Sequence, residues 1–184
     1  MDYTEKTAAV HDIYRGRIVY LHEDEVTLPD GAPAQREIVE HTGGVAILPL
    51  DDDGSVFCVR QYRYAVREHL LELPAGKLNE GEEPLACAVR ELSEETGFTA
   101  RELIPLGAVY PSPGYCRETL YMYLARGLEN GRQHLDEGEF LDVEKHSLDE
   151  LVSMSLSGEI MDAKTVIAVL KTKLYIDGNG GDHA

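Results

Sequence analysis

The chain has 184 residues, which is enough for one domain with a sizeable hydrophobic core. Its 17 basic and 34 acidic residues give a formal net charge of −17, which disfavours binding to nucleic-acid polymers and anionic membranes. No apolar run approaches the roughly 20 residues that cross a bilayer, and the first residues lack the order of a signal peptide. We therefore expect a cytoplasmic enzyme or binding protein that does not contact membranes.

The N-terminal region alternates polar and apolar residues and contains many β-branched side chains. Between residues 13 and 39 this pattern predicts two or three strands, with a turn at residues 29–33. We assign residues 1–42 to a separate N-terminal β-strand region. The main domain is expected to span residues 43–176.

The main domain opens with a nearly continuous apolar run at residues 43–50, which indicates a buried strand. Three aspartates and a glycine at residues 51–54 predict a hairpin turn, with the return strand at residues 56–64. Another strand is expected to end at Pro74. A helix should then begin near Pro84, because proline is favoured in the first helical turn.

Further strands and helices follow the central helix in the sequence. Two strands are expected on either side of a Pro/Gly-rich loop at residues 111–118, and a third lies within residues 135–146. Residues 147–156 and 162–175 have the period of helices, and residues 177–184 are expected to form a flexible tail. The order of these elements predicts a mixed α/β (α+β) fold.

The helix that begins at Pro84 has an apolar stripe and a run of glutamates. Leu85, Ala88, Val89 and Leu92 have the spacing of one apolar face. On another face, three glutamates fall at positions i, i+3 and i+4, so their side chains are neighbours about 5–6 Å apart. These are Glu91, Glu94 and Glu95. Three neighbouring anions near a helix C-terminus are unfavourable without a counter-charge, and Mg²⁺ or Mn²⁺ would supply one.

The spacing of the surrounding residues is more specific than the helix alone. Gly76, Glu82, the Arg90-Glu91-Leu92 triplet, the Glu94-Glu95 pair and Gly97-Phe98 occur in the pattern G-x5-E-x7-R-E-U-x-E-E-x-G-U, where U is apolar. Every specified position matches, and the pattern resembles the Nudix box. The resemblance implies a Nudix-type α/β/α sandwich with a mixed sheet, and a loop-helix-loop that holds divalent cations against a diphosphate.

The resemblance also implies roles for individual residues. Glu91 and Glu95 correspond to direct metal ligands, and the backbone carbonyl of Ala75 and the side chain of Glu139 correspond to further ones. Glu94 belongs to the same metal-binding segment and is a catalytic candidate. The implied cofactor is Mg²⁺, with Mn²⁺ or Zn²⁺ as alternatives. Gly76, Glu82 and Arg90 would support the loop and orient the glutamates.

Three segments outside the box resemble the ADP-ribose pyrophosphatase subfamily. They are residues 60–78, the Pro/Gly loop with Pro113 sixteen residues beyond Gly97, and the acidic loop at residues 136–143. The resemblance implies that Arg63 binds a phosphate or the terminal ribose. The other candidates for substrate contacts are Glu72, Pro113, Gly114 and Glu118.

The implied reaction is hydrolysis of ADP-ribose to AMP and ribose 5-phosphate, with Glu137 or Glu139 taking a proton from the attacking water. Two alternatives stay open at this point. One is hydrolysis of another nucleoside diphosphate sugar, such as GDP-mannose, and the other is a nucleotide-binding module without catalysis. The subfamily resemblance also implies a homodimer formed by exchange of the N-terminal β-strand region.

Overall fold

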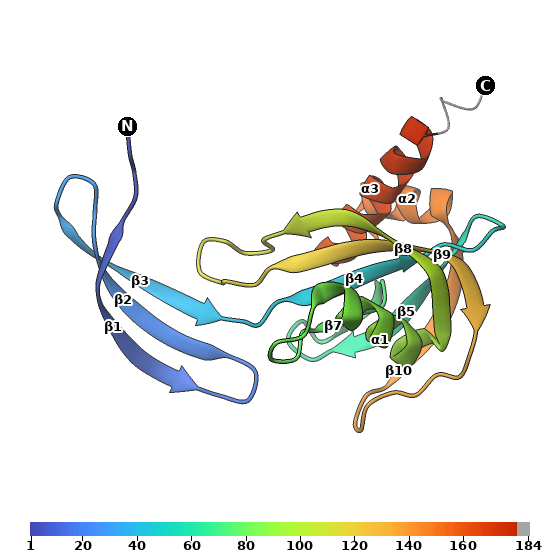
Figure 1. Cartoon of the computed structure of the whole chain (residues 1–184), viewed down its shortest axis with the longest axis horizontal. Coiled ribbons are helices and arrows are strands. Elements are labelled where there is room, and N and C mark those ends of the chain that lie inside the picture. Colours follow the sequence, from blue (N-terminus) through green and yellow to red (C-terminus); the bar gives the residue numbers. More distant parts are fainter. Residues whose placement is uncertain (180–184) are drawn as a thin grey trace. The chain divides into compact units, whose positions relative to one another are not determined.

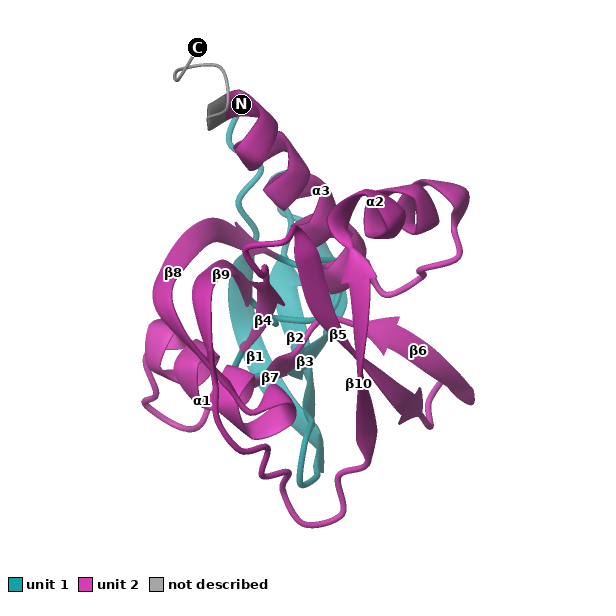
Figure 2. Ribbon diagram, turned by 90° about the vertical axis from the view of Figure 1, so that its right-hand side faces the viewer, with its two compact units in different colours: residues 1–43, 110–119 teal, residues 44–109, 120–184 magenta. Residues whose placement is uncertain are grey.

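The computed structural model describes residues 1–179 and separates the chain into two compact units. Unit 1 contains residues 1–43 and 110–119, and unit 2 contains residues 44–109 and the chain from residue 120 onward. Figure 2 colours unit 1 teal and unit 2 magenta. Within residues 1–179, no helix is both long and apolar enough to cross a membrane.

Unit 1 is an antiparallel sheet in which successive strands are neighbours (Figure 1). Its strands are β1 (Lys6–Arg15), β2 (Tyr20–Thr27) and β3 (Pro33–Glu40). The expected strands and the turn near residue 30 are therefore confirmed, although the first strand begins earlier than the alternation indicated. The 110–119 loop joins this sheet, since the backbone N–H of Val39 donates to the carbonyl of Tyr115 at 2.7 Å.

The main sheet of unit 2 has the order β7-β4-β9-β8. Its strands are β7 (Ala75–Lys77), β4 (Gly44–Pro49), β9 (Leu120–Asn130) and β8 (Phe98–Val109). Strands β4 and β9 are parallel, whereas the β4–β7 and β8–β9 pairs are antiparallel. The sheet is therefore mixed, as the resemblance to the Nudix family implied.

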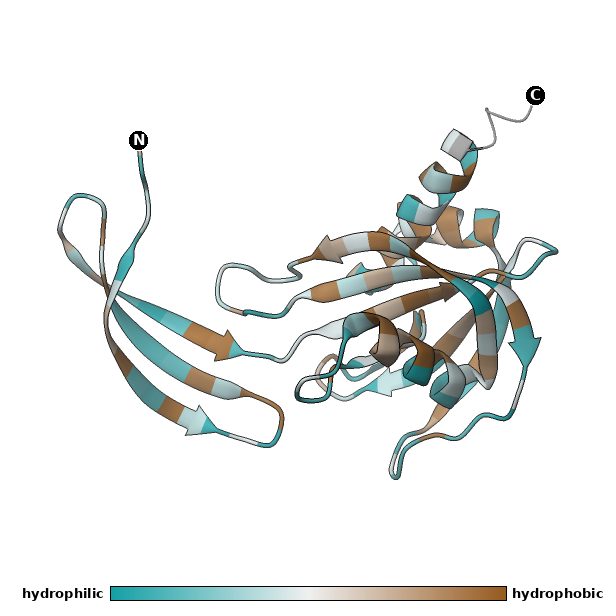
Figure 3. Cartoon of the chain, viewed as in Figure 1, coloured by the Kyte–Doolittle hydropathy of each residue, from teal (hydrophilic) through white to brown (hydrophobic). Residues whose placement is uncertain are grey.

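Helices cover both faces of this sheet. Successive residues of a strand point to opposite sides, so alternate residues of β4 pack against different helices. Val45 and Ile47 of β4 pack in one hydrophobic cluster with residues of helix α1 (Pro84–Thr96). Ala46 and Leu48 pack in the other cluster with residues of α2 (Leu148–Ser157) and α3 (Ala163–Asn179). The α/β/α sandwich is thus confirmed, and Figure 3 shows apolar residues concentrated in the strands between these helices.

Strand β5 (Ser55–Arg63) does not pair with β4 as the expected hairpin requires. The turn forms, with the N–H of Asp51 donating to the carbonyl of Ser55 at 2.8 Å. Both sides of β4 are already occupied by β7 and β9, so β5 continues into a second sheet of order β10-β5-β6. The hairpin prediction was therefore wrong beyond its turn. The two partners of β5 are β6 (Glu68–Glu72) and β10 (Leu141–Ser147).

The buried face of α1 also differs from the predicted one. Leu85 and Val89 are each 50% exposed, whereas Cys87, Ala88, Leu92 and Glu95 are buried. The helix is turned so that a carboxylate occupies a position that periodicity would give to an apolar residue. At the other end of the chain, α3 reaches Asn179, so the first residues of the expected tail are helical. Residues 180–184 of that expected tail lie outside the described part.

Candidate active site

Gly76 lets the β7 backbone lie directly against the carboxylate of Glu91. A Cβ atom built at Gly76 would be 1.9 Å from the Glu91 carboxyl carbon, so a side chain here would displace that carboxylate. Gly97 has φ 76° and ends α1, with its N–H donating to the carbonyl of Ser93 at 2.9 Å. Glycine is therefore required at the two box positions for different reasons. Gly76 allows the close approach of Glu91, and Gly97 adopts the left-handed backbone conformation that ends the helix.

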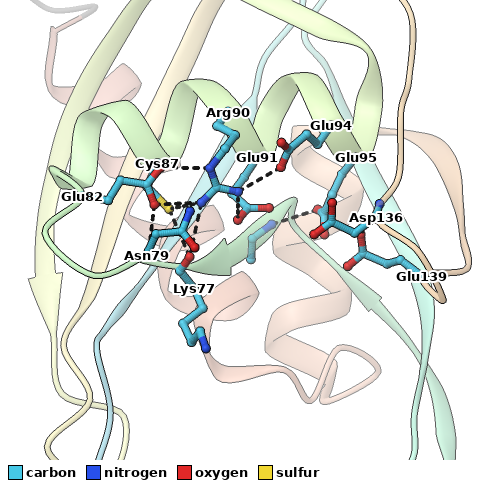
Figure 4. A network of polar contacts seen from close by, with 11 residues as sticks. Lys77, Asn79, Glu82, Cys87, Arg90, Glu91, Glu94, Glu95, Asp136 and Glu139 are labelled. Carbon is cyan, nitrogen blue, oxygen red and sulfur yellow. Dashed lines mark hydrogen bonds and ion pairs between the residues drawn. The ribbon is translucent and has the colours of Figure 1, made fainter. Parts of the chain in front are cut away.

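Arg90 connects the loop before α1 to the glutamates on the helix (Figure 4). Its Nε and Nη2 donate to the two carboxylate oxygens of Glu82, each at 2.9 Å. Its Nη1 donates to Glu91 at 2.6 Å and to Glu94 at 2.9 Å. The hydrogen bond from Arg90, together with one from the backbone N–H of Asn79, lowers the pKa of Glu82 to about 2. One guanidinium therefore orients three carboxylates and leaves them with net negative charge.

Glu95 is the most deeply buried of the helix glutamates, at 2% exposure. Its Oε2 accepts a hydrogen bond from the backbone N–H of Ala75 at 2.9 Å. The pKa of Glu95 is raised to about 8, mainly by burial and also by the charges of Glu91 and Glu139, although the hydrogen bond from Ala75 lowers it. Burial likewise raises the pKa of Glu91. A nearby cation would relieve both effects.

Glu139 comes from the loop between β9 and β10, and Figure 4 shows it with Asp136 beside Glu95. The N–H of Glu139 donates to the carbonyl of Asp136 at 3.0 Å. The structure thus brings Glu139 to the helix glutamates. Glu137 is exposed, in the turn between Asp136 and Glu139. Sequence reasoning did not single out Asp136, although its place in an acidic loop three residues before Glu139 was a usable signal.

The loop between β9 and β10, which leads into the acidic residues, is attached to the C-terminal end of α1. The side chain of Gln133 donates to the carbonyl of Glu95 at 2.6 Å, and the backbone N–H of His134 donates to the carbonyl of Glu94 at 3.1 Å. These bonds satisfy carbonyls that the last turn of a helix leaves without partners. The loop that carries Glu139 is therefore fixed to the helix that carries Glu95.

Arg63 lies at the end of β5 and forms a two-pronged ion pair with Glu72 at the end of β6. Its Nε and Nη2 each donate to a different oxygen of Glu72, both at 2.6 Å. Lys164 at the start of α3 binds the same carboxylate. The Glu72 ion pair raises the pKa of Arg63, and the charges of Asp162 and Glu95 add to that effect. Lys164 was missed, because a lysine at a helix start is usually a solvated residue.

The remaining candidates belong to unit 1. Pro113 and Gly114 lie exposed in a turn, and Glu118 lies 3.8 Å from His41 Nδ1. Contact between these three residues and a substrate stays a prediction.

The donor atoms of the site suit a hard divalent cation, but they do not form a closed ligand set. Among residues 1–179, no group of three His, Cys, Asp or Glu side chains is arranged to hold a metal ion. Arg90 occupies oxygens of Glu91 and Glu94, and Ala75 occupies one of Glu95. Nevertheless, Glu91, Glu95 and Glu139 repel one another, and carboxylate oxygens are what Mg²⁺ prefers. These residues fit such a cation chemically.

Comparison with known proteins identifies relatives in fold and in sequence. A crystal structure of an ADP compounds hydrolase matches with a TM-score of 0.85 and covers 96% of each chain, and at 23% identity this likeness shows the fold. An ADP-ribose pyrophosphatase from Bacillus subtilis (strain 168) is 41% identical over 90% of each chain. A methanol dehydrogenase activator from Bacillus methanolicus is 40% identical over 91% of each chain. The NUDIX domain model matches residues 40–168, and the chain belongs to this family.

Proposed function

We propose that this chain hydrolyses the diphosphate bond of ADP-ribose to give AMP and ribose 5-phosphate. The observation that carries the proposal is the carboxylate group of Glu91, Glu95 and Glu139 beside the Gly76 backbone. Support for the substrate comes from the 41% identical ADP-ribose pyrophosphatase, which aligns along 90% of both chains. Support also comes from the cationic Arg63, which is oriented on the neighbouring sheet.

We further propose Mg²⁺ as the cofactor, held by Glu91 and Glu95 with Glu139 and the carbonyl of Ala75. A divalent cation bound there would neutralise charge on the diphosphate and lower the pKa of a bound water. Arg90 keeps Glu91 and Glu94 in place, since its guanidinium bridges both. The mutual repulsion of the carboxylates supports this assignment.

The chain's own residues perform the remaining steps. Arg63 binds a phosphate oxygen or the terminal ribose, because a planar guanidinium makes directed hydrogen bonds to such groups. Glu137 takes the proton from the attacking water, and Glu139, two residues away on the same loop, serves the metal. Glu137 is exposed and Glu139 half-buried, which favours this division of roles. Rate enhancement then comes from positioning and electrostatics.

A homodimer formed through residues 1–42 is also proposed. Strand β1 is exposed along nearly its whole length, and Val10, Ile13 and Tyr14 are 53%, 54% and 57% exposed. Large apolar side chains grouped on one strand are typical of a surface that another chain covers. Light scattering of the purified protein, compared with a V10S/I13S variant, tests this proposal.

The test of the function is AMP release from ADP-ribose with Mg²⁺, measured beside GDP-mannose and NADH. Metal-dependent AMP formation that disappears in Glu95→Gln supports both the substrate and the site. Turnover of GDP-mannose or NADH without turnover of ADP-ribose would contradict the substrate and leave the chemistry in place. Absence of turnover on every compound would favour the second candidate suggested by the 40% identical relative, the activation of a dehydrogenase.

A further inference from the structure

Glu72 is a carboxylate buried inside unit 2, at 1% exposure, and it serves two cations. Both of its oxygens accept hydrogen bonds from Arg63, and Lys164 donates to one of them. Burial alone raises the pKa of Glu72, but Arg63 and Lys164 together lower it below the ordinary value. The carboxylate is therefore held as an anion by both partners.

Lys164 is held in turn by the first turn of α3. Its Nζ lies 2.9 Å from Asp162, which also accepts hydrogen bonds from Thr165 through the backbone N–H at 3.1 Å and Oγ1 at 2.6 Å. Thr165 Oγ1 accepts the backbone N–H of Leu73 at 2.9 Å. The start of α3 thus contacts two consecutive residues, Glu72 and Leu73, which lie just before the Ala75–Gly76 pair.

These contacts determine how Arg63 meets an anion. The ion pair with Glu72 uses Nε and Nη2 and leaves Nη1 outside it, on a side chain that is 42% exposed. With Lys164 present, the two cations balance the carboxylates of Glu72 and Asp162. Without Lys164, the remaining three residues (Arg63, Glu72 and Asp162) carry one net negative charge, and Arg63 becomes the one cation that pairs with Glu72. A diphosphate would then meet a repelling group where it now meets an oriented cation.

We propose that Lys164 is a positioning residue that keeps Arg63 oriented for the substrate's diphosphate by sharing Glu72. This inference rests on the proposed function only in assigning Arg63 to phosphate binding. Lys164 itself is 14% exposed and acts through Glu72.

The experiment compares Lys164→Gln with Lys164→Arg and with Lys173→Gln. Lys173 is the matched control, because it also lies on α3 and pairs with carboxylates, those of Asp149 and Asp177, each at 3.2 Å. For Lys164→Gln we expect the KM for ADP-ribose to rise roughly tenfold, the scale of one charge-assisted hydrogen bond, with kcat within about threefold. Lys164→Arg should restore most of the affinity, and Lys173→Gln should behave like the wild type.

A second arm asks whether Lys164 acts through Arg63. In an Arg63→Gln background, Lys164→Gln should raise KM by less than about twofold, because the interaction that it supports is already gone. An equal tenfold rise in both backgrounds would overturn the proposal, as would an unchanged KM in the single variant. If Lys164→Gln does not fold, Asp162→Asn replaces it. This change keeps a capping oxygen, adds one net positive charge and should lower KM, and a raised KM would contradict the inference.

Calorimetric titration with inorganic diphosphate and Mg²⁺ separates this inference from the choice of substrate. If the wild type hydrolyses no ADP-ribose, the proposed function fails, while the diphosphate Kd still tests Lys164. A weaker Kd in Lys164→Gln, but not in Lys173→Gln, supports the inference. An equal Kd in both variants, or no diphosphate binding by the wild type, would overturn it.

Discussion

The Glu95 carboxylate on α1 accepts the backbone N–H of Ala75 at 2.9 Å, which joins the helix to the residue just before the box glycine. The Glu95 side chain is therefore both a structural contact and a proposed metal ligand. These two roles make different demands on its charge, since the hydrogen bond needs only an oxygen, whereas the metal needs an anion.

For Glu95→Gln we expect loss of turnover together with a gain in metal-free stability. The amide oxygen can still accept the Ala75 N–H, but the buried charge and its repulsion from Glu91 and Glu139 disappear. At pH 8 in EDTA, the melting temperature should rise by about 4 °C or more, the shift that roughly 1–2 kcal/mol produces in a domain of this size. Addition of Mg²⁺ should stabilise the wild type more than the variant. A metal-free variant less stable than the wild type would contradict this account of Glu95.

For Gly76→Ala we expect loss of activity because the new methyl group would occupy the position of the Glu91 carboxylate, 1.9 Å away. The displaced carboxylate would leave Arg90, so turnover should fall by about 100-fold, the scale of losing an oriented ligand contact. Gly178→Ala is the control, since nothing lies within 4 Å of a Cβ there. Steady-state kinetics of both variants decide the matter, and near-normal turnover of Gly76→Ala would show that Glu91 tolerates displacement.

For Glu82→Gln we expect a smaller loss of stability on acidification than in the wild type. The folded-state pKa of Glu82 is lowered to about 2 by Arg90 and by the Asn79 N–H. Its stabilising contribution is therefore present above the unfolded pKa of about 4.3 and is lost as pH falls from there toward 2. Urea midpoints measured from pH 6 to pH 2.5 should fall less steeply in Glu82→Gln than in Glu102→Gln, an exposed-strand control. Parallel curves for the two variants would refute the pairing with Arg90.

The two loop glutamates should give separable losses. Glu139→Gln is expected to weaken Mg²⁺ binding, because Glu139 lies beside Glu95 and its charge acts on that carboxyl. Glu137→Gln should lower kcat by about 100-fold or more, within the range of general-base catalysis, while the Mg²⁺-induced thermal shift stays unchanged. Thermal shift and kcat measured on both variants assign the roles. The reverse result would exchange them.

Helix α1 was predictable from the sequence because both of its ends carry residues with strong local preferences. Pro84 and Gly97 fix its bounds through φ preferences that operate without tertiary contacts. Its buried face was not predictable from periodicity, because Glu95 takes a core position that its contact with Ala75 makes possible. Long-range contacts of this kind leave no mark in the spacing of residues.

The same distinction applies to the rest of the site and fold. The box glutamates could be found because they lie on one helix, whereas Lys164 reaches Glu72 from 92 residues away. The turn after β4 was readable from its aspartates and glycine, but the departure of β5 depends on β7 and β9 occupying both sides of β4. Which strand pairs with which is a property of the whole sheet.

The attachment of the acidic loop to the end of α1 limits the reach of Glu139. The His134 N–H is bonded to the Glu94 carbonyl at 3.1 Å, so only the five residues from 135 to 139 separate a fixed point from the Glu139 side chain. Five fully extended residues span at most about 18 Å. On its other side Glu139 lies two residues before Leu141, which pairs with Gln61 of β5, so the loop is fixed at both ends. Because Glu139 lies nearer to β10 than to its anchor on α1, the pairing of β10 with β5 sets the tighter limit on how far its carboxylate can move from the helix glutamates.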